Sequence, residues 1–249
     1  MSSLASEERR SWIGSQLRLS KSISLATAAQ ELGVSEMTVR RDLDHMESLG
    51  IARRVRGGAV YSGTVNFHGR ERSHTSEKQS IAEKLLPLVP PSGVIAMDSS
   101  TTMYRLAQLI TGGGDLVVIT NGLLTFQALQ ERPGVTAILT GGEADRRSDS
   151  LVGPVATALL DGMRFSTFFV STAAIDDRAI YEDTLEEADV KRAFARSSAR
   201  VVLGAHSDKL GDRATSTAFT LDQVAVLATE LEPDAGELAP YRAHVREIL

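Results

Sequence analysis

Hydrophobic residues recur at two different spacings along this chain of 249 residues, and the change of spacing divides it into two parts. In the first part they recur every three or four positions, which is the period of a helix with one buried side. This spacing predicts a helix from about Ser6 to Leu17 that buries Trp12, Ile13 and Leu17. A second helix is predicted over Leu25–Leu32, with Ser24 placed to cap its N-terminus.

A third helix is predicted directly after a tight turn. Gly33 can adopt the left-handed conformation that ends one helix, and Ser35 can cap the start of the next. At about 100 degrees per residue, this helix has one apolar and one polar side. The apolar side carries Val39, Leu43 and Met46, and the polar side carries Met37, Arg40, Arg41 and Asp44. This is the pattern of a helix-turn-helix whose second helix enters a DNA groove, although solvated arginines on an ordinary amphipathic helix are the alternative.

Residues 51–61 form two short extended runs about a Gly-Gly turn. Three arginines, Arg53, Arg54 and Arg56, lie near the tip of this hairpin. Three helices followed by a hairpin predict a winged helix-turn-helix, and arginines at the tip favour contacts with DNA phosphate or with the minor groove.

In the second part of the chain, short apolar runs alternate with helical patterns. Strands are predicted at Val94–Met97, Leu116–Thr120, Val135–Thr140, Phe168–Thr172, Arg200–Gly204 and Val224–Ala228. Helices are predicted near Ile81–Val89, Thr102–Ile110, Leu123–Gln130, Val155–Met163 and Glu186–Ser197, while Tyr241–Leu249 is too short to assign. Such alternation predicts an α/β fold with a mostly parallel sheet, in which ligands bind beyond the carboxyl ends of the strands.

Composition and charge fit this division. We assign residues 1–62 to a DNA-binding domain, 63–76 to a linker without hydrophobic period, and 77–249 to an α/β domain. The net charge is −5, yet residues 1–62 carry nine Lys/Arg against seven Asp/Glu, so the positive excess lies in the predicted DNA-binding domain. We expect a cytoplasmic protein without membrane contact, because no apolar run reaches the roughly 18 residues of a membrane span and the N-terminus is polar. With no cysteine and only scattered histidines, we expect neither a bound metal nor a cofactor.

Polar residues suited to a phosphorylated ligand follow the predicted strands. Asp98-Ser99-Ser100-Thr101-Thr102 runs into a helix, where hydroxyls and backbone N–H groups suit phosphate, although the hydroxyls could simply cap the helix. Asn121 ends the second strand, and Gly141 and Gly142 after the third let backbone approach a ligand closely. Glu187 and Lys191 stand four apart on one helix, for which a surface ion pair is the alternative, and Lys209 follows the fifth strand.

These residues resemble the DeoR family of bacterial transcriptional regulators. The N-terminal match is Val34-Ser35-Glu36-Met37-Thr38-Val39-Arg40-Arg41-Asp42-Leu43 followed by Gly57-Gly58-Ala59, with Arg56 where that family often has histidine. The C-terminal match is the order of Asp98–Thr102, Thr120-Asn121, Gly141–Glu143, Gly153-Pro154, Glu187–Lys191 and Lys209. Ser100, Ala174, Ala179 and His206 depart from the family pattern, which affects the expected pocket rather than the expected fold.

The resemblance implies a repressor of sugar metabolism genes whose second domain is similar to ribose-5-phosphate isomerase. Its partners would be a double-stranded DNA operator, a phosphorylated sugar effector and further copies of the chain in a homodimer or homotetramer. The DNA-binding residues would be Ser35, Met37, Thr38, Arg40, Arg41, Arg53, Arg54 and Arg56. The effector-binding residues would be Lys78, Asp98, Ser99, Ser100, Thr101, Thr102, Asn121, Gly141, Gly142, Glu187, Lys191 and Lys209, with Lys78 or Lys209 supplying positive charge to a phosphate.

Two other interpretations remain at this point. One is an active sugar-phosphate isomerase with an accessory DNA-binding module. Against it, the related isomerases carry Asp-Gly-Ala-Asp after the fourth strand, whereas this chain has Ser171-Thr172-Ala173-Ala174 and therefore lacks the positioned base of a proton-transfer enzyme. The other is a DNA-binding protein whose second domain only oligomerises. The sequence names neither the operator nor the effector.

Overall fold

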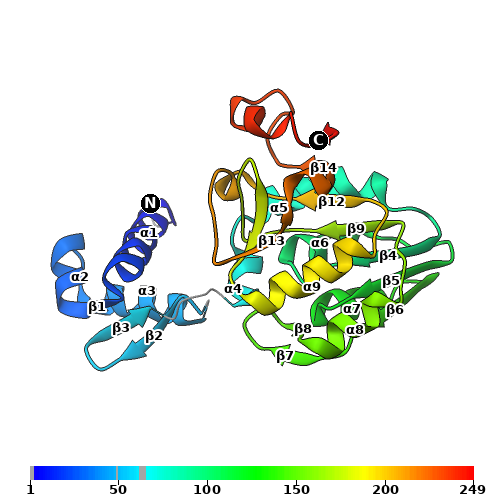
Figure 1. The fold of residues 1–249 in the computed structure, drawn as a ribbon. Helices are drawn as coiled ribbons and strands as arrows, with labels where there is room; N and C mark the ends of the chain where they lie inside the picture. The colour runs from blue at the N-terminus through cyan, green and yellow to red at the C-terminus, as the bar shows by residue number, and fades with distance from the viewer. Residues whose placement is uncertain (1–2, 49, 62–65) are drawn as a thin grey trace. The chain divides into compact units, whose positions relative to one another are not determined.

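The computed structural model describes residues 3–48, 50–61 and 66–249, and the chain forms two compact units, residues 1–73 and 74–249 (Figure 1). The first unit contains the helices α1 (Ser3–Ser20), α2 (Leu25–Leu32) and α3 (Glu36–Ser48). Their apolar sides meet in a core that includes the fully buried residues Ile13, Leu17, Val39 and Leu43. The three predicted helices of the DNA-binding domain are therefore confirmed.

The turn between α2 and α3 has the predicted chemistry. Gly33 has a φ of 63° and its N–H donates to the carbonyl oxygens of Ala29 and Gln30. Ser35 Oγ accepts a hydrogen bond from the backbone N–H of Thr38 at 3.2 Å. Ser24 occupies the N-cap position of α2, as predicted, but its side chain makes no cap bond, and Ser24 also ends a strand that was not predicted.

That strand, β1 (Ser22–Ser24), joins the wing hairpin of β2 (Ala52–Val55) and β3 (Gly58–Tyr61) in an antiparallel sheet of order β1-β3-β2. The two glycines of the turn have different tasks. Gly57 has a φ of 82°, which suits glycine, whereas a Cβ on Gly58 would lie 2.0 Å from the carbonyl oxygen of Ile23 in β1. Glycine 57 thus makes the turn, and glycine 58 lets β1 pair with the wing.

The range 63–76, predicted as a linker, holds α4 (Phe67–Arg72) and the start of α5 (Thr75–Leu85), while residues 63–65 lie outside the described part. Asn66 caps α4 by accepting from the N–H of Gly69 at 2.8 Å, and the side chain of Phe67 is buried. This helix is too short to give a hydrophobic period, which is why the sequence pattern did not reveal it. The division between the two units falls after residue 73, inside this range.

The second unit is built on a parallel sheet of seven strands in the order β15-β14-β12-β9-β4-β5-β6. The strands are β4 (Gly93–Met97), β5 (Leu116–Thr120), β6 (Val135–Leu139), β9 (Thr167–Val170), β12 (Val201–Gly204), β14 (Val224–Ala228) and β15 (Glu247–Ile248). All six predicted strands are present, and the seventh lies in the C-terminal segment that the sequence analysis left unassigned.

Helices cover both faces of this sheet (Figure 1). One face packs against α5, α6 (Thr101–Leu109) and α7 (Leu123–Gln130) through residues such as Ile81, Met103 and Leu129. The other face packs against α8 (Pro154–Asp161) and α9 (Leu185–Arg196) through residues such as Leu160 and Phe194. The predicted α/β class is therefore confirmed. None of the helices among the described residues has the length and apolar character needed to cross a membrane.

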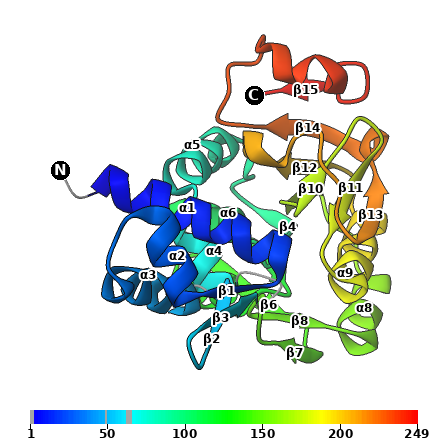
Figure 2. The ribbon, with the colours of Figure 1, turned by 90° about the vertical axis from the view of Figure 1, so that its left-hand side faces the viewer.

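Two small antiparallel sheets were not predicted. β7 (Glu143–Asp145) pairs with β8 (Ser150–Val152), and β11 (Ala179–Glu182) lies between β10 (Ala174–Ile175) and β13 (Ser216–Thr220), as Figure 2 shows for the second sheet. Most of these strands have two to four residues, which is too short for a readable alternation. The remaining elements are short 3-10 helices at Leu86–Leu88, Ser207–Lys209, Leu221–Gln223 and Gly236–Tyr241.

Candidate functional site

The polar side of α3 is the candidate DNA-reading surface. Arg40 and Arg41 are exposed, and Met37 between them and the turn is 57% exposed. The apolar side of the same helix is buried, so the two sides are separated as predicted. Asp42, which follows the two arginines, is buried and accepts from Arg9 Nε of α1 at 2.5 Å and from Arg9 Nη2 at 3.1 Å. Asp42 thus fixes α3 against α1.

Ser35 and Thr38 stabilise the beginning of α3. Their hydroxyl oxygens lie 3.0 Å apart, in addition to the cap bond from the Thr38 N–H. Both residues stand at the N-terminal turn of the helix, which is the part of a recognition helix that reaches base edges.

The three wing arginines differ in their surroundings. Arg53 and Arg56 are exposed. Arg54 instead turns toward α3, where its Nη1 forms an ion pair with Asp44 Oδ1 and donates to the carbonyl oxygen of Arg40 at 3.3 Å. Arg54 therefore differs from Arg53 and Arg56 in being bonded to α3, and its predicted contact with DNA stays a prediction.

In the second unit, the strand-end residues surround one buried ammonium group. Lys191 Nζ donates to Glu182 Oε1 at 2.5 Å and to the carbonyl oxygen of Ser171 at 2.8 Å, and it lies 3.0 Å from Asp98 Oδ2. Lys191 is only 4% exposed, so the surface ion pair with Glu187 that was considered from the sequence is wrong. An ammonium has three donors, and three oxygen atoms of the protein lie within 3.0 Å of this one.

Charge around Lys191 is unbalanced, because several carboxylates face one ammonium. Burial lowers the pKa of Lys191, but the charges of Glu182, Asp98 and Glu187 outweigh this effect and raise it. Burial raises the pKa of Glu182 to about 7, even though the charge of Lys191 acts in the opposite direction. Lys191 therefore stays charged and holds the carboxylates in place.

The loop from Asp98 to Thr102 is folded tightly around Asp98. Asp98 Oδ1 accepts from the backbone N–H of Ser100 at 2.9 Å and from its hydroxyl at 2.5 Å, and Ser100 Oγ caps α6 by accepting from the N–H of Met103 at 3.2 Å. The capping interpretation thus holds for Ser100. Thr101 and Thr102 begin α6 and are buried.

Glu187 connects this loop to the β7–β8 hairpin. Its Oε1 accepts from Ser150 Oγ at 2.6 Å, and its Oε2 lies 3.5 Å from Ser99 Oγ, which points to it as a donor. Asn121 lies beside the same hairpin, since its Nδ2 donates to the carbonyl oxygen of Leu151 at 3.2 Å. Asn121 Oδ1 is buried and has no hydrogen-bond partner among the described residues.

The two glycines after β6 allow a close approach of backbone segments. Gly141 and Gly142 have φ angles of 74° and 118°. A Cβ on Gly142 would lie 2.5 Å from the carbonyl oxygen of Val152 in β8. Gly142 therefore permits a close approach of neighbouring backbone, and the predicted approach to a ligand stays a prediction.

Lys209 completes the strand-end group from the side of β12. Its Nζ donates to Ser171 Oγ at 3.1 Å and to the carbonyl oxygen of Thr172. Lys78 on α5 is 3% exposed, and its positive charge helps to lower the pKa of His206. Burial, with the charges of Lys209, His74 and Lys78, lowers the pKa of His206 to about 2.

Several residues of this site could not be identified from the sequence. Glu182 and Ser171 accept hydrogen bonds from Lys191, and Ser150 donates one to Glu187. Glu182 and Ser150 lie in short strands and Ser171 follows a strand, and none of the three belongs to a motif. The histidines were judged to be scattered, but the fold stacks His74 on His206 with ring centroids 4.3 Å apart. Ala174 and Ala179, which depart from the family pattern, are buried in the β10–β11 hairpin.

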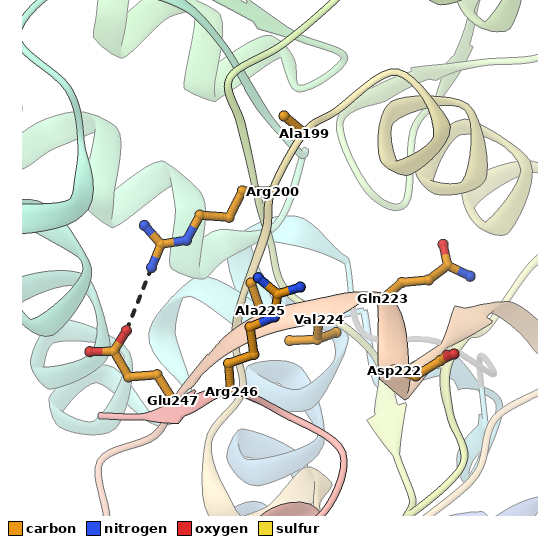
Figure 3. Close-up of a pocket in the computed structure, with 8 residues that line it drawn as sticks. All are labelled: Ala199, Arg200, Asp222, Gln223, Val224, Ala225, Arg246 and Glu247. Atoms are coloured by element: carbon orange, nitrogen blue, oxygen red, sulfur yellow. Dashed lines mark ion pairs between the residues drawn. The ribbon is translucent and has the colours of Figure 1, made fainter.

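A hollow of about 350 Å³ lies elsewhere, at the amino ends of β12 and β14 (Figure 3). It is lined by Arg200, Asp222, Gln223, Arg246 and Glu247 together with apolar neighbours. Arg200 Nη2 and Glu247 Oε2 form an ion pair at 3.6 Å in its lining (Figure 3). Ligands of parallel α/β sheets bind at the carboxyl ends, so we do not assign the predicted effector to this hollow.

In comparisons with known proteins, each of the two units matches a family model of its own. Residues 9–65 match the family model described as the DeoR-like helix-turn-helix domain, and residues 73–231 match the DeoR C terminal sensor domain. The lactose phosphotransferase system repressor of Streptococcus mutans serotype c is 31% identical over 92% of this chain and 93% of its own length. The HTH-type transcriptional regulator GolR of Listeria innocua is 29% identical over 90% of each chain. Among solved structures, ribose 5 phosphate isomerase A from Neisseria gonorrhoeae is 15% identical, with a TM-score of 0.36 over 55% of this chain and 53% of that chain.

Proposed function

Because this chain belongs to the DeoR family of transcriptional regulators, we propose that it represses genes of sugar metabolism and leaves its operator when a phosphorylated sugar or related metabolite binds the second unit. The relatives are named regulators and repressors, so the chain is a regulator rather than an isomerase. One relative is named a lactose phosphotransferase system repressor, which supports a sugar-related target for this chain.

The observation that carries the DNA-binding part of the proposal is the separation of the two sides of α3. Its apolar side packs in the core, and Arg40 and Arg41 are exposed on the other side. An arginine in the major groove can donate two hydrogen bonds to one guanine, which supports about 1–3 kcal/mol of discrimination. Arg53 and Arg56 are exposed on the wing and suit phosphate or minor-groove contacts.

We also propose that the effector binds at the carboxyl ends of β4, β5, β9 and β12. The N-terminus of α6 offers backbone N–H groups at Thr101 and Thr102 to a phosphate, and Lys209 and Lys78 bring positive charge. Asn121 Oδ1 is an acceptor suited to a sugar hydroxyl. Lys191 acts as a positioning residue, because its donors hold Glu182, Asp98 and Ser171.

The assembly is proposed to be a homodimer or homotetramer. The first unit is small, and residues 1–62 have an excess of only two positive charges. One such unit offers few phosphate contacts, whereas two units on a two-fold axis double them. Since the operator is chromosomal DNA, we propose that the protein acts in the cytoplasm.

The DNA-binding proposal is tested with an Arg40→Ala, Arg41→Ala double variant. The probe is the duplex that the wild-type protein selects from a random pool, and binding is followed by fluorescence anisotropy. We expect at least a tenfold loss of affinity, since each lost bidentate contact removes about 1–3 kcal/mol. The matched control replaces Arg164 and Arg196, two exposed arginines of the second unit, and should bind as the wild type does. Wild-type affinity in the Arg40→Ala, Arg41→Ala variant would refute the role given to α3.

A further inference from the structure

Two histidines and an aspartate that are far apart in the sequence meet in the second unit. His74 directly precedes α5, His206 follows β12, and Asp208 lies in the short 3-10 helix after it. One potential metal-ligand atom from each side chain lies within 4.8 Å of the other two. None of these three residues is among the predicted effector-binding residues, although Lys209 and Lys78 act electrostatically on His206.

We propose that His74, His206 and Asp208 form a binding site for one divalent transition-metal ion of the Zn²⁺ class. Two imidazole nitrogens and one carboxylate oxygen are a ligand set that Zn²⁺ uses in proteins, and three protein ligands leave one position open for water or another oxygen ligand. The proposal concerns metal binding itself and does not rest on the effector proposed above.

His206 supplies the observation that points to a ligand. The residue is only 7% exposed, and its Nδ1 is buried without a hydrogen-bond partner among the described residues. A buried nitrogen without a partner destabilises the fold, so nearly all such atoms in proteins have one. A metal ion bound through Nδ1 would satisfy this nitrogen, because a neutral imidazole offers a lone pair to a metal through either Nδ1 or Nε2.

The distance between the other two side chains fits the same interpretation. His74 Nε2 lies 3.4 Å from Asp208 Oδ2. Two ligand atoms around a tetrahedral Zn²⁺, each about 2.0–2.1 Å from the ion, lie about 3.3 Å apart. On the other side of the ring, His74 Nδ1 lies 3.9 Å from Glu77 Oε1. A carboxylate at this place favours the proton on Nδ1 and leaves the Nε2 lone pair for the metal.

Metal binding requires a small movement of His74. The rings of His74 and His206 stack with an angle of 14° between their planes. A ligated ion lies in the plane of each imidazole, and one ion cannot lie in two parallel planes. The His74 side chain is 36% exposed and can turn about its Cβ–Cγ bond, whereas His206 is held by its surroundings. The ion would therefore replace the stacked arrangement.

The neighbouring charges determine how tightly such a site can bind. Lys209 and Lys78 place positive charge near His206, which opposes a cation. Lys209 directs its ammonium at Ser171 Oγ and the Thr172 carbonyl oxygen, and the carboxylates of Asp208 and Glu77 contribute negative charge on the other side. We therefore expect weaker binding than in a structural site with four protein ligands.

The test uses the full-length chain without an affinity tag, freed of metal by a chelator. Zn²⁺ is titrated against a chromogenic competitor, and Co²⁺ is used in parallel because its absorption spectrum reports ligand number. The variants are His74→Gln and Asp208→Asn, alone and together, since both side chains are partly exposed and their replacement leaves the core unchanged. The matched controls are His244→Gln and Asp212→Asn, which change exposed residues of the same types in the same unit.

We expect the wild type and both controls to bind one equivalent of Zn²⁺ with the same affinity. Each ligand variant should bind at least tenfold more weakly, because even loss of a residue that only orients a ligand costs about 10–100-fold. In histidine-selective NMR of the wild type, Zn²⁺ should shift the ring nitrogens of His206. If the double variant binds Zn²⁺ as tightly as the wild type, or if His206 does not respond, the cluster is only a histidine–carboxylate contact and the proposal is overturned.

Discussion

At the scale of single residues, Lys191 organises the strand-end site. Its ammonium is almost completely buried and contacts Asp98, Glu182 and the carbonyl oxygen of Ser171, which come from the end of β4, from β11 and from the loop after β9. Removing one member of a buried ion pair leaves the opposite charges buried without compensation, and this is strongly destabilising. Lys191 therefore matters for stability as well as for the shape of the site.

We predict that Lys191→Met lowers the free energy of unfolding by about 3–5 kcal/mol, the range seen when one partner of a buried pair is removed. Urea unfolding followed by circular dichroism measures this loss. The matched control is Arg196→Met on the same helix, whose guanidinium lies 3.7 Å from Asp161 on the surface and which should cost at most about 1 kcal/mol. Equal losses in the two variants would show that Lys191 is not the central charge of the site.

The sequence could identify one side of these contacts but not the other. Asp98, Lys191 and Lys209 belong to a recognisable order of motifs. Glu182 and Ser150 do not, because each is one polar residue in a short strand whose partner is decided by tertiary packing. For the same reason the alternative of a surface ion pair between Glu187 and Lys191 could not be excluded from the sequence, since spacing on a helix does not reveal which buried groups lie opposite it.

At the scale of elements, the wing is attached to the recognition helix by Arg54. Its guanidinium bonds to Asp44 and to the Arg40 carbonyl oxygen of α3, and its backbone N–H donates to Glu47 Oε1 at 2.7 Å. Arg56 lies at the exposed tip of the same hairpin. The sequence gives no reason to distinguish Arg54 from Arg56, but in the structure Arg54 bonds to α3 whereas Arg56 is exposed.

We predict different effects for Arg54→Ala and Arg56→Ala. Arg56→Ala should reduce the slope of log K against log salt by about 0.9, as expected for one lost phosphate contact, and leave the melting temperature of the protein unchanged. Arg54→Ala should lower the melting temperature and weaken operator binding with little change in the salt slope. Anisotropy titrations at several salt concentrations, together with thermal melts, provide both quantities. The assignment fails if the two variants behave alike.

Long elements with a clear period were predictable, and short ones were not. The helices α1, α2 and α3 of the first unit and six parallel strands of the second follow from spacing alone, because each buries a continuous apolar side. β1, α4 and the strands of the two small antiparallel sheets have six residues or fewer and depend on partners distant in the sequence. The wing turn was foreseen as glycine-rich, but the need for Gly58 became visible only when β1 was found beside it.

At the scale of the whole molecule, the chain is expected to bind DNA as a dimer or a larger even assembly. Two first units related by a two-fold axis read inverted half-sites whose centres are about one helical turn, or a multiple of it, apart. Footprinting on the selected duplex and analytical ultracentrifugation measure the spacing and the stoichiometry. This expectation would be contradicted if the footprint covers one unrepeated half-site and the protein sediments as a monomer.

The central claim is that an effector in the second unit controls operator binding by the first. If a ligand prefers the state that binds DNA poorly, linkage requires DNA to weaken ligand binding by the same factor. The coupling can therefore be measured from either side, and the two measurements must agree.

The most direct test is calorimetry of a panel of sugar phosphates with the wild-type protein, with and without the operator duplex. We expect one member of the panel to bind, to do so more weakly when operator is present, and to weaken operator binding by the same factor. A Thr101→Ala, Thr102→Ala, Lys209→Ala variant should bind this sugar phosphate poorly, and it should remain bound to the operator when the sugar phosphate is present. If no sugar phosphate binds the wild type, or if a bound one has the same affinity with and without operator, the second unit is not the sensor that controls DNA binding.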